Sequence, residues 1–155
     1  QLQEILGGIF RAKKLTISTA ESLTSGAIAS RITSVPGASE YFTGGIVAYS
    51  NDVKIQQLGV SEDVLKSSGA VCAETVKQMA KGVQNLFGTD YAIATSGIAG
   101  PGGGTDEKPV GTVWIAIAGP KEIVVEQFQM GKGRERVVEK TIFSALNLLL
   151  QLVSQ

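Results

Sequence analysis

The segment that most constrains the fold is the run Tyr-Ala-Ile-Ala-Thr at residues 91–95, in which polar and apolar side chains do not alternate. A strand of this kind suits a sheet that is covered on both faces, because neither of its faces then meets water. Residues 15–19 form a β-branched run, and the small and apolar residues after it predict a helix over 22–33. This order indicates an α/β fold with residues 91–95 central in its sheet.

The remaining segments extend the pattern. One strand and three helices are expected in the middle of the chain, at 44–49, 51–58, 61–66 and 73–87. Two strands joined by a short turn and a final helix are expected after them, at 110–118, 122–130 and 134–153. We therefore predict one domain, residues 1–155, with a three-layer α/β/α sandwich around a mixed, mostly parallel sheet.

Charge and composition exclude several classes of function. The 14 basic and 14 acidic side chains cancel, so no overall field attracts nucleic acid or an anionic membrane. Cys72 is the only cysteine and histidine is absent, which excludes an internal disulfide and argues against a structural zinc site. The first residues lack the features of a signal peptide, and no apolar run approaches membrane-spanning length. We expect a cytoplasmic protein without a metal or cofactor, and without a nucleic-acid or membrane partner.

Ser22 is the first candidate for chemistry, because it follows a predicted strand at the start of a predicted helix. The commoner interpretation is a helix cap, and the alternative is a nucleophile whose oxyanion meets N–H groups of the turn 23–26. Glu21 beside it either orients a polar substrate group or is solvated. In a chain without histidine, lysine is the principal residue left to take the proton of such a serine.

Lys54 is the candidate base. If Ser50 or Asn51 caps the next helix, Lys54 lies in the first turn, where the helix dipole disfavours a second positive charge. That field, together with partial burial, favours the neutral amine that a general base requires. The alternative is an ordinary surface lysine. Tyr49, at a strand end, either packs in the core or stacks on a ring and donates a hydrogen bond.

Two further segments are candidates for binding. The glycine-rich segment 95–109 leaves the central strand, where ligands of open α/β sheets bind, and Ser96 and Gly97 either cradle a ligand or belong to a flexible loop. Its spacing matches neither a P-loop nor a dinucleotide fingerprint. At the start of the last helix, Arg134 either is solvated or binds an anion.

Five collinear blocks carry a family resemblance: AESLTSG at 20–26, YSNDVK at 49–54, GAV at 69–71, SGIAGP at 96–101 and KPVGTV at 108–113. Together they resemble the C-terminal domain of the CinA family, the nicotinamide-nucleotide amidohydrolases. The resemblance implies hydrolysis of the carboxamide of nicotinamide mononucleotide to nicotinic acid mononucleotide and ammonia by a serine and lysine pair.

Carried over to this chain, the resemblance makes Ser22 the nucleophile, Lys54 the general base and Tyr49 the tyrosine beside them. It also makes residues 95–100 the loop that borders the substrate and Arg134 the first arginine of a late basic motif. With the candidates that the residues themselves offer, the expected substrate-binding set is Glu21, Thr24, Gly26, Thr95, Ser96, Gly97, Arg134 and Arg136. A small nucleotide and further copies of the chain, in a homo-oligomer, are the expected partners.

The chain departs from the family pattern at Leu23 and Ser25, in the serine turn, and at Val138, where a second arginine commonly lies. Arg136 or Lys132 is the candidate to replace that arginine. Because of these departures, two alternatives stay open: a non-catalytic nucleotide-binding or regulatory module of the same fold, and an amidase for another small amide.

Overall fold

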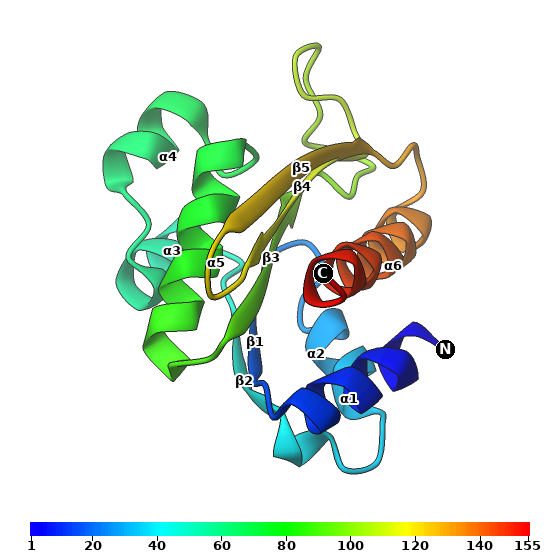
Figure 1. Cartoon of the computed structure of the whole chain (residues 1–155). Helices are drawn as coiled ribbons and strands as arrows, with labels where there is room; N and C mark the ends of the chain where they lie inside the picture. Colours follow the sequence, from blue (N-terminus) through cyan, green and yellow to red (C-terminus); the bar gives the residue numbers. More distant parts are fainter.

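The computed structural model describes residues 1–155, which form a five-stranded sheet with helices on both faces (Figure 1). The strands are β1 (Ile17–Glu21), β2 (Phe42–Val47), β3 (Tyr91–Gly97), β4 (Thr112–Ala118) and β5 (Ile123–Gln129). The helices are α1 (Leu2–Lys13), α2 (Ala27–Thr33), α3 (Asn51–Leu58), α4 (Glu62–Ser68), α5 (Ala73–Phe87) and α6 (Arg134–Val153), with a short 3-10 helix at Ala38–Glu40. None of these helices has both the length and the apolar character needed to cross a membrane.

The sheet has the order β2-β1-β3-β4-β5, so β3 is central as predicted. Strands β1, β2 and β3 are parallel, β4 is antiparallel to β3, and β5 is antiparallel to β4. The sheet is therefore mixed, with only β4 reversed. This topology follows from the connections, because helical crossovers join the parallel strands and a short turn joins β4 to β5.

Two apolar cores lie on opposite faces of the sheet, which confirms the three-layer arrangement. Helices α1, α2 and α6 cover one face, on which the large side chains Ile93, Ile115 and Ile117 lie. Helices α3, α4 and α5 cover the other, to which the strands contribute alanines: Ala20, Ala92, Ala94, Ala116 and Ala118. The alternation along β3 and β4 is thus between large and small apolar residues, and small residues let α5 pack close to the strands.

Two expectations about helices need correction. The first is the helix over 22–33, because α2 begins only at Ala27 and residues 22–26 form a turn. Ser25 has φ 52 and Gly26 has φ 94, and this left-handed backbone interrupts any helix at that point. The second is α1, which was not predicted although Leu6 and Phe10 lie one helical turn apart and are buried.

The parallel strands determine where the site lies. Glu21, the last residue of β1, pairs with Val47 of β2 and with Thr95 of β3. The chain therefore leaves three neighbouring strands at one edge of the sheet, and the residues that follow each strand come together there. This is the edge at which open α/β sheets bind ligands.

Candidate active site

The turn that carries Ser22 is attached to β3 at two points. The N–H of Ser22 donates to the carbonyl oxygen of Thr95 over 3.1 Å, and the hydroxyls of Thr24 and Thr95 are 2.9 Å apart. Both threonines are buried. Thr24 and Thr95 therefore hold the serine turn in place, and neither side chain lines the cavity around Ser22.

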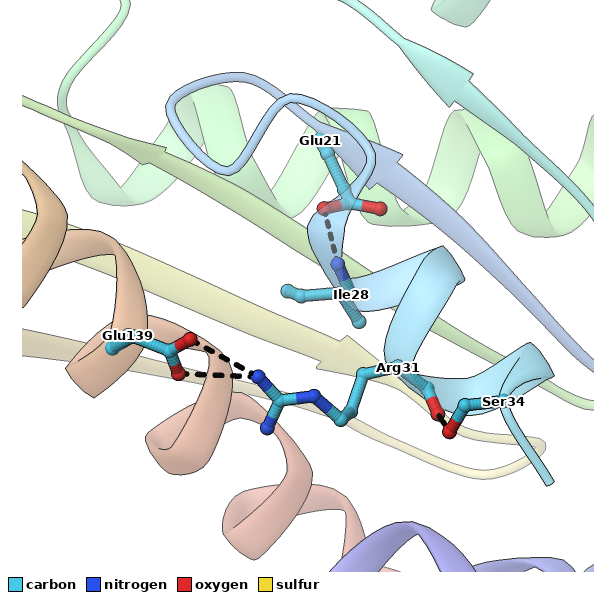
Figure 2. A network of polar contacts seen from close by, with 5 residues as sticks. All are labelled: Glu21, Ile28, Arg31, Ser34 and Glu139. Carbon is cyan, nitrogen blue, oxygen red and sulfur yellow. Dashed lines mark hydrogen bonds and ion pairs between the residues drawn. The ribbon is translucent and has the colours of Figure 1, made fainter.

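Glu21 supports the same turn from the other side. Its carboxylate is only 1% exposed, and its two oxygens accept the N–H groups of Ile28 and Ala29, each over 2.9 Å. Figure 2 shows this carboxylate at the first turn of α2, where free N–H groups and the helix dipole favour a negative charge. Glu21 thus caps the start of α2, which begins five residues after Ser22. Glu21 does not line the cavity around Ser22.

Lys54 meets Ser22 from α3. Ser50 caps this helix by accepting the N–H of Val53, as expected, and Lys54 is the fourth helical residue. Its side chain is 1% exposed, with Nζ 3.3 Å from Ser22 Oγ and 3.2 Å from the carbonyl oxygen of Tyr49. No carboxylate pairs with this amine.

Burial lowers the pKa of Lys54, because an ammonium loses its hydration there and gains no counter-charge. The sequence pattern indicated the helix dipole as the main effect, whereas burial is the cause in the folded protein. The neutral amine can accept the Ser22 hydroxyl proton with its lone pair while one N–H donates to the Tyr49 carbonyl.

Tyr49 and Arg134 border the cavity. The Tyr49 ring is 57% exposed, and its hydroxyl oxygen accepts a hydrogen bond from Arg134 Nη2 over 3.1 Å. Arg134 Nη1 donates to the carbonyl oxygen of Gly100 over 2.7 Å. Arg134 therefore joins the start of α6 to the glycine-rich loop and to Tyr49, and it leaves the Tyr49 hydroxyl proton free to donate to a ligand.

A cavity of about 230 Å³ connects these groups. Six residues expected in the site line it: Ser22, Tyr49, Lys54, Ser96, Gly97 and Arg134. Ser96 is a buried residue that lines the cavity, and its hydroxyl makes no hydrogen bond within the chain, so the hydroxyl can bind a group inside the cavity. Arg136 and Lys132 lie apart from this cavity, on an exposed surface at the start of α6.

Five lining residues were not named in the expected set: Leu23, Asn51, Ala70, Val71 and Ala99. Ala70 and Val71 belong to the block GAV, which the resemblance had included without giving it a role. Asn51 is the first residue of α3. One signal in the sequence could have indicated Asn51: it lies between Tyr49 and Lys54, which were both expected in the site.

Free N–H groups are present beside the serine. Those of Leu23 and Thr24 donate to no atom of the chain, whereas that of Ser25 donates to the carbonyl oxygen of Ser22. Unpaired N–H groups next to a nucleophile are what an oxyanion requires. The turn therefore has two unpaired N–H groups, and Leu23, which carries one of them, also lines the cavity.

The fold accommodates the three departures from the family pattern. Leu23 packs in the larger core and also lines the cavity. Ser25 adopts φ 52, a left-handed conformation that glycine reaches at lower cost. Val138 lines a separate groove between α2 and α6.

Comparison with known proteins agrees with this architecture. Residues 1–153 match the family described as the CinA C-terminal domain. The chain belongs to this family. It is 46% identical over 148 residues to a CinA-like protein of Flavobacterium psychrophilum, covering 96% of this chain and 35% of that protein. A CinA-like protein of Geotalea daltonii is 47% identical over 148 residues, covering 96% of this chain and 36% of that protein.

The chain thus spans about a third of the length of these CinA relatives. Two solved structures, by contrast, match this chain over almost their whole length. The crystal structure of the competence/damage inducible protein CihA from Agrobacterium tumefaciens superposes with a TM-score of 0.96 at 37% identity, covering 99% of this chain and 94% of that chain. A competence damage-inducible protein A from Klebsiella pneumoniae gives 0.96 at 31% identity, covering 99% and 96%.

Proposed function

We propose that this CinA-family domain hydrolyses the carboxamide of nicotinamide mononucleotide, giving nicotinic acid mononucleotide and ammonia, with Ser22 as nucleophile and Lys54 as base. The observation that carries the proposal is the Lys54 amine, which is buried without a carboxylate and lies 3.3 Å from Ser22 Oγ. Burying an unpaired lysine costs stability, and proteins retain such costs at functional sites.

In the first step the neutral Lys54 amine takes the proton of Ser22 as Oγ attacks the amide carbon. The carbonyl oxygen becomes an oxyanion, and the unpaired N–H group of Leu23, a residue that lines the cavity, is its candidate donor. The ammonium of Lys54 then gives its proton to the amide nitrogen, the C–N bond breaks, and ammonia leaves. An ester between the nicotinoyl group and Ser22 remains.

In the second step a water molecule replaces ammonia and loses a proton to Lys54 as it attacks the ester carbon. Ser22 leaves and regains a proton from Lys54, so that one water is consumed for each amide hydrolysed. The Tyr49 carbonyl keeps the amine aligned in both steps, since it accepts an N–H from Nζ over 3.2 Å. The Tyr49 ring and Ser96 contribute to binding of the pyridine carboxamide.

An ammonia-release assay with nicotinamide mononucleotide tests this proposal. We expect ammonia and nicotinic acid mononucleotide in equal amounts from the wild-type protein, and none above background from Ser22→Ala. Ser34→Ala is the matched control, because Ser34 is an exposed serine at the end of α2. An undiminished rate in Ser22→Ala would exclude Ser22 as the nucleophile.

A non-catalytic nucleotide-binding module is the second candidate. Leu23 favours it, because this departure from the family pattern follows Ser22 directly and forms part of the cavity wall. Calorimetric binding of the mononucleotide without ammonia release would identify such a module. Ammonia released from another small amide, and not from the mononucleotide, would instead identify an amidase of different specificity.

A further inference from the structure

A second, wider cavity adjoins the site. It is a groove of about 890 Å³ between α2 and the first half of α6, here called the α2–α6 groove. Leu23 and Arg134 line both the groove and the Ser22 cavity, so the two spaces meet at these residues. A molecule whose amide reaches Ser22, and which is too large for the inner cavity, can therefore extend into the groove.

The charged side chains of the groove include two cations, Arg134 at the junction and Arg31 further along α2. Figure 2 shows Arg31 extending from α2 across to Glu139 of α6. A single nitrogen, Nη2, contacts both carboxylate oxygens, over 3.2 and 3.1 Å. The Nε and Nη1 groups of Arg31 donate to no atom of the chain, and its side chain is 35% exposed.

We propose that the α2–α6 groove receives the phosphate end of the substrate and that Arg31 is the side chain that binds the phosphate. This inference rests on the proposed function, because it places the amide of the same mononucleotide at Ser22. Arg31 suits the role because Glu139 holds the guanidinium in position while three N–H groups remain for phosphate oxygens.

The other cations near α6 are less well placed. Lys132 and Arg136 line an exposed surface that they share with Arg134, and neither lines the groove or the Ser22 cavity. Arg134 has already committed Nη1 to Gly100 and Nη2 to Tyr49. Arg31 therefore keeps two nitrogens, Nε and Nη1, without a partner in the chain, whereas Arg134 keeps only Nε.

Two carboxylates oppose an anion in this groove. Glu139 contacts Arg31, and Glu135 lies in the first turn of α6, where the helix dipole stabilises its charge. Their charges reduce the attraction for a phosphate. Neutralising Glu139 is therefore expected to strengthen phosphate binding, whereas removing Arg31 weakens it.

Binding is best measured in a protein that cannot turn the ligand over. In the Ser22→Ala background, calorimetry would give dissociation constants for nicotinamide mononucleotide and for nicotinamide riboside, which lacks the phosphate. We expect the mononucleotide to bind more tightly. Adding Arg31→Met should weaken mononucleotide binding about tenfold or more, as expected for losing a charge-assisted hydrogen bond, and should leave riboside binding unchanged.

Arg11→Met is the matched control, since Arg11 also pairs with a glutamate, Glu40, but lies away from both cavities. It should change neither constant, and Glu139→Gln should tighten mononucleotide binding alone. Equal mononucleotide binding with and without Arg31 would overturn the phosphate role while ammonia release by the wild type still supported the amidase. A different outcome is that the wild-type protein releases no ammonia while Arg31→Met still weakens binding of the mononucleotide but not of the riboside. This outcome would support the phosphate role and refute the amidase.

Discussion

The amine of Lys54 lies 3.2 Å from the backbone carbonyl oxygen of Tyr49, five residues before it in the chain. A neutral amine has two N–H groups and one lone pair, and this contact uses one of the N–H groups. The lone pair can then point to Ser22 Oγ, which is 3.3 Å away. A main-chain group, which no side-chain substitution removes, thus orients the proposed base.

Replacing this base should abolish turnover. We expect Lys54→Met to lower the rate of ammonia release by a factor of about 10²–10⁴, the contribution of a positioned general base. Lys66→Met is the control, because Lys66 is exposed and pairs only with Glu62 one turn away. Circular dichroism of both variants would show that the fold persists. A Lys54→Met protein with more than a tenth of the wild-type rate would contradict the role of Lys54.

Activity should depend on pH through the same amine. Burial lowers the pKa of Lys54, and only the neutral form accepts the serine proton. Turnover at saturating substrate should therefore rise with pH through an apparent pKa below the ordinary lysine value of about 10.4. The residual activity of Lys54→Met should lack this inflection. A wild-type rate that stays level from neutral pH to about 10 would exclude titration of the base in this range.

Stability should follow pH in the same direction. Because the pKa of Lys54 is lower in the folded chain, the unfolded chain binds more protons between that pKa and about 10.4, and stability rises with pH across this window. Lys54→Met removes this term. Its free energy of unfolding relative to wild type should be most favourable below the lowered pKa and decline towards pH 10.4.

Urea denaturation of both proteins at a series of pH values would measure the change. The hydrogen bonds that disappear with the amine add an offset that does not vary with pH, so the slope of the difference is the test. A difference that is independent of pH would show that Lys54 has the same pKa in the folded and unfolded chains.

The carboxylate of Glu21 should matter for stability more than its position beside Ser22 suggests. Glu21→Gln replaces one of two buried acceptors by a donor that faces an N–H group of α2, at an expected cost of about 1–3 kcal/mol. Glu62→Gln, at an exposed i,i+4 pair, should cost less than about 0.5 kcal/mol. Urea midpoints would compare them, and equal midpoints would refute a capping role for Glu21.

Local patterns predicted most of the fold, whereas the family resemblance was needed to choose the candidate residues of the site. The unalternating run at 91–95 predicted the central strand because its two faces meet two cores. Ser22 and Lys54 were paired through the absence of histidine and the family resemblance, and the structure brings them together because they follow the neighbouring parallel strands β1 and β2. The helix capped by Ser50 was recognised from its hydroxyl.

Features that depend on tertiary contacts could not be predicted in this way. The late start of α2 depends on Ser25, which adopts a left-handed backbone without being glycine, and on a carboxylate seven residues before the N–H that it caps. The cavity beside Lys54 is also lined by segments far along the chain, including Ser96 of β3. The place of Arg31 in the α2–α6 groove could not be predicted, because this groove forms only when α6 packs beside α2.

The parallel pairing of β1 with β2 also bears on how activity should be lost on heating. Ser22 follows one of these strands and Lys54 belongs to the helix after the other, and both strands lie within one hydrogen-bonded sheet. Ser22 lies one residue beyond β1 and Lys54 seven residues beyond β2, so we expect the two groups to stay together while these strands remain paired. Heat inactivation and the cooperative melting of the sheet should consequently share one midpoint, so that residual activity is a direct measure of the folded fraction.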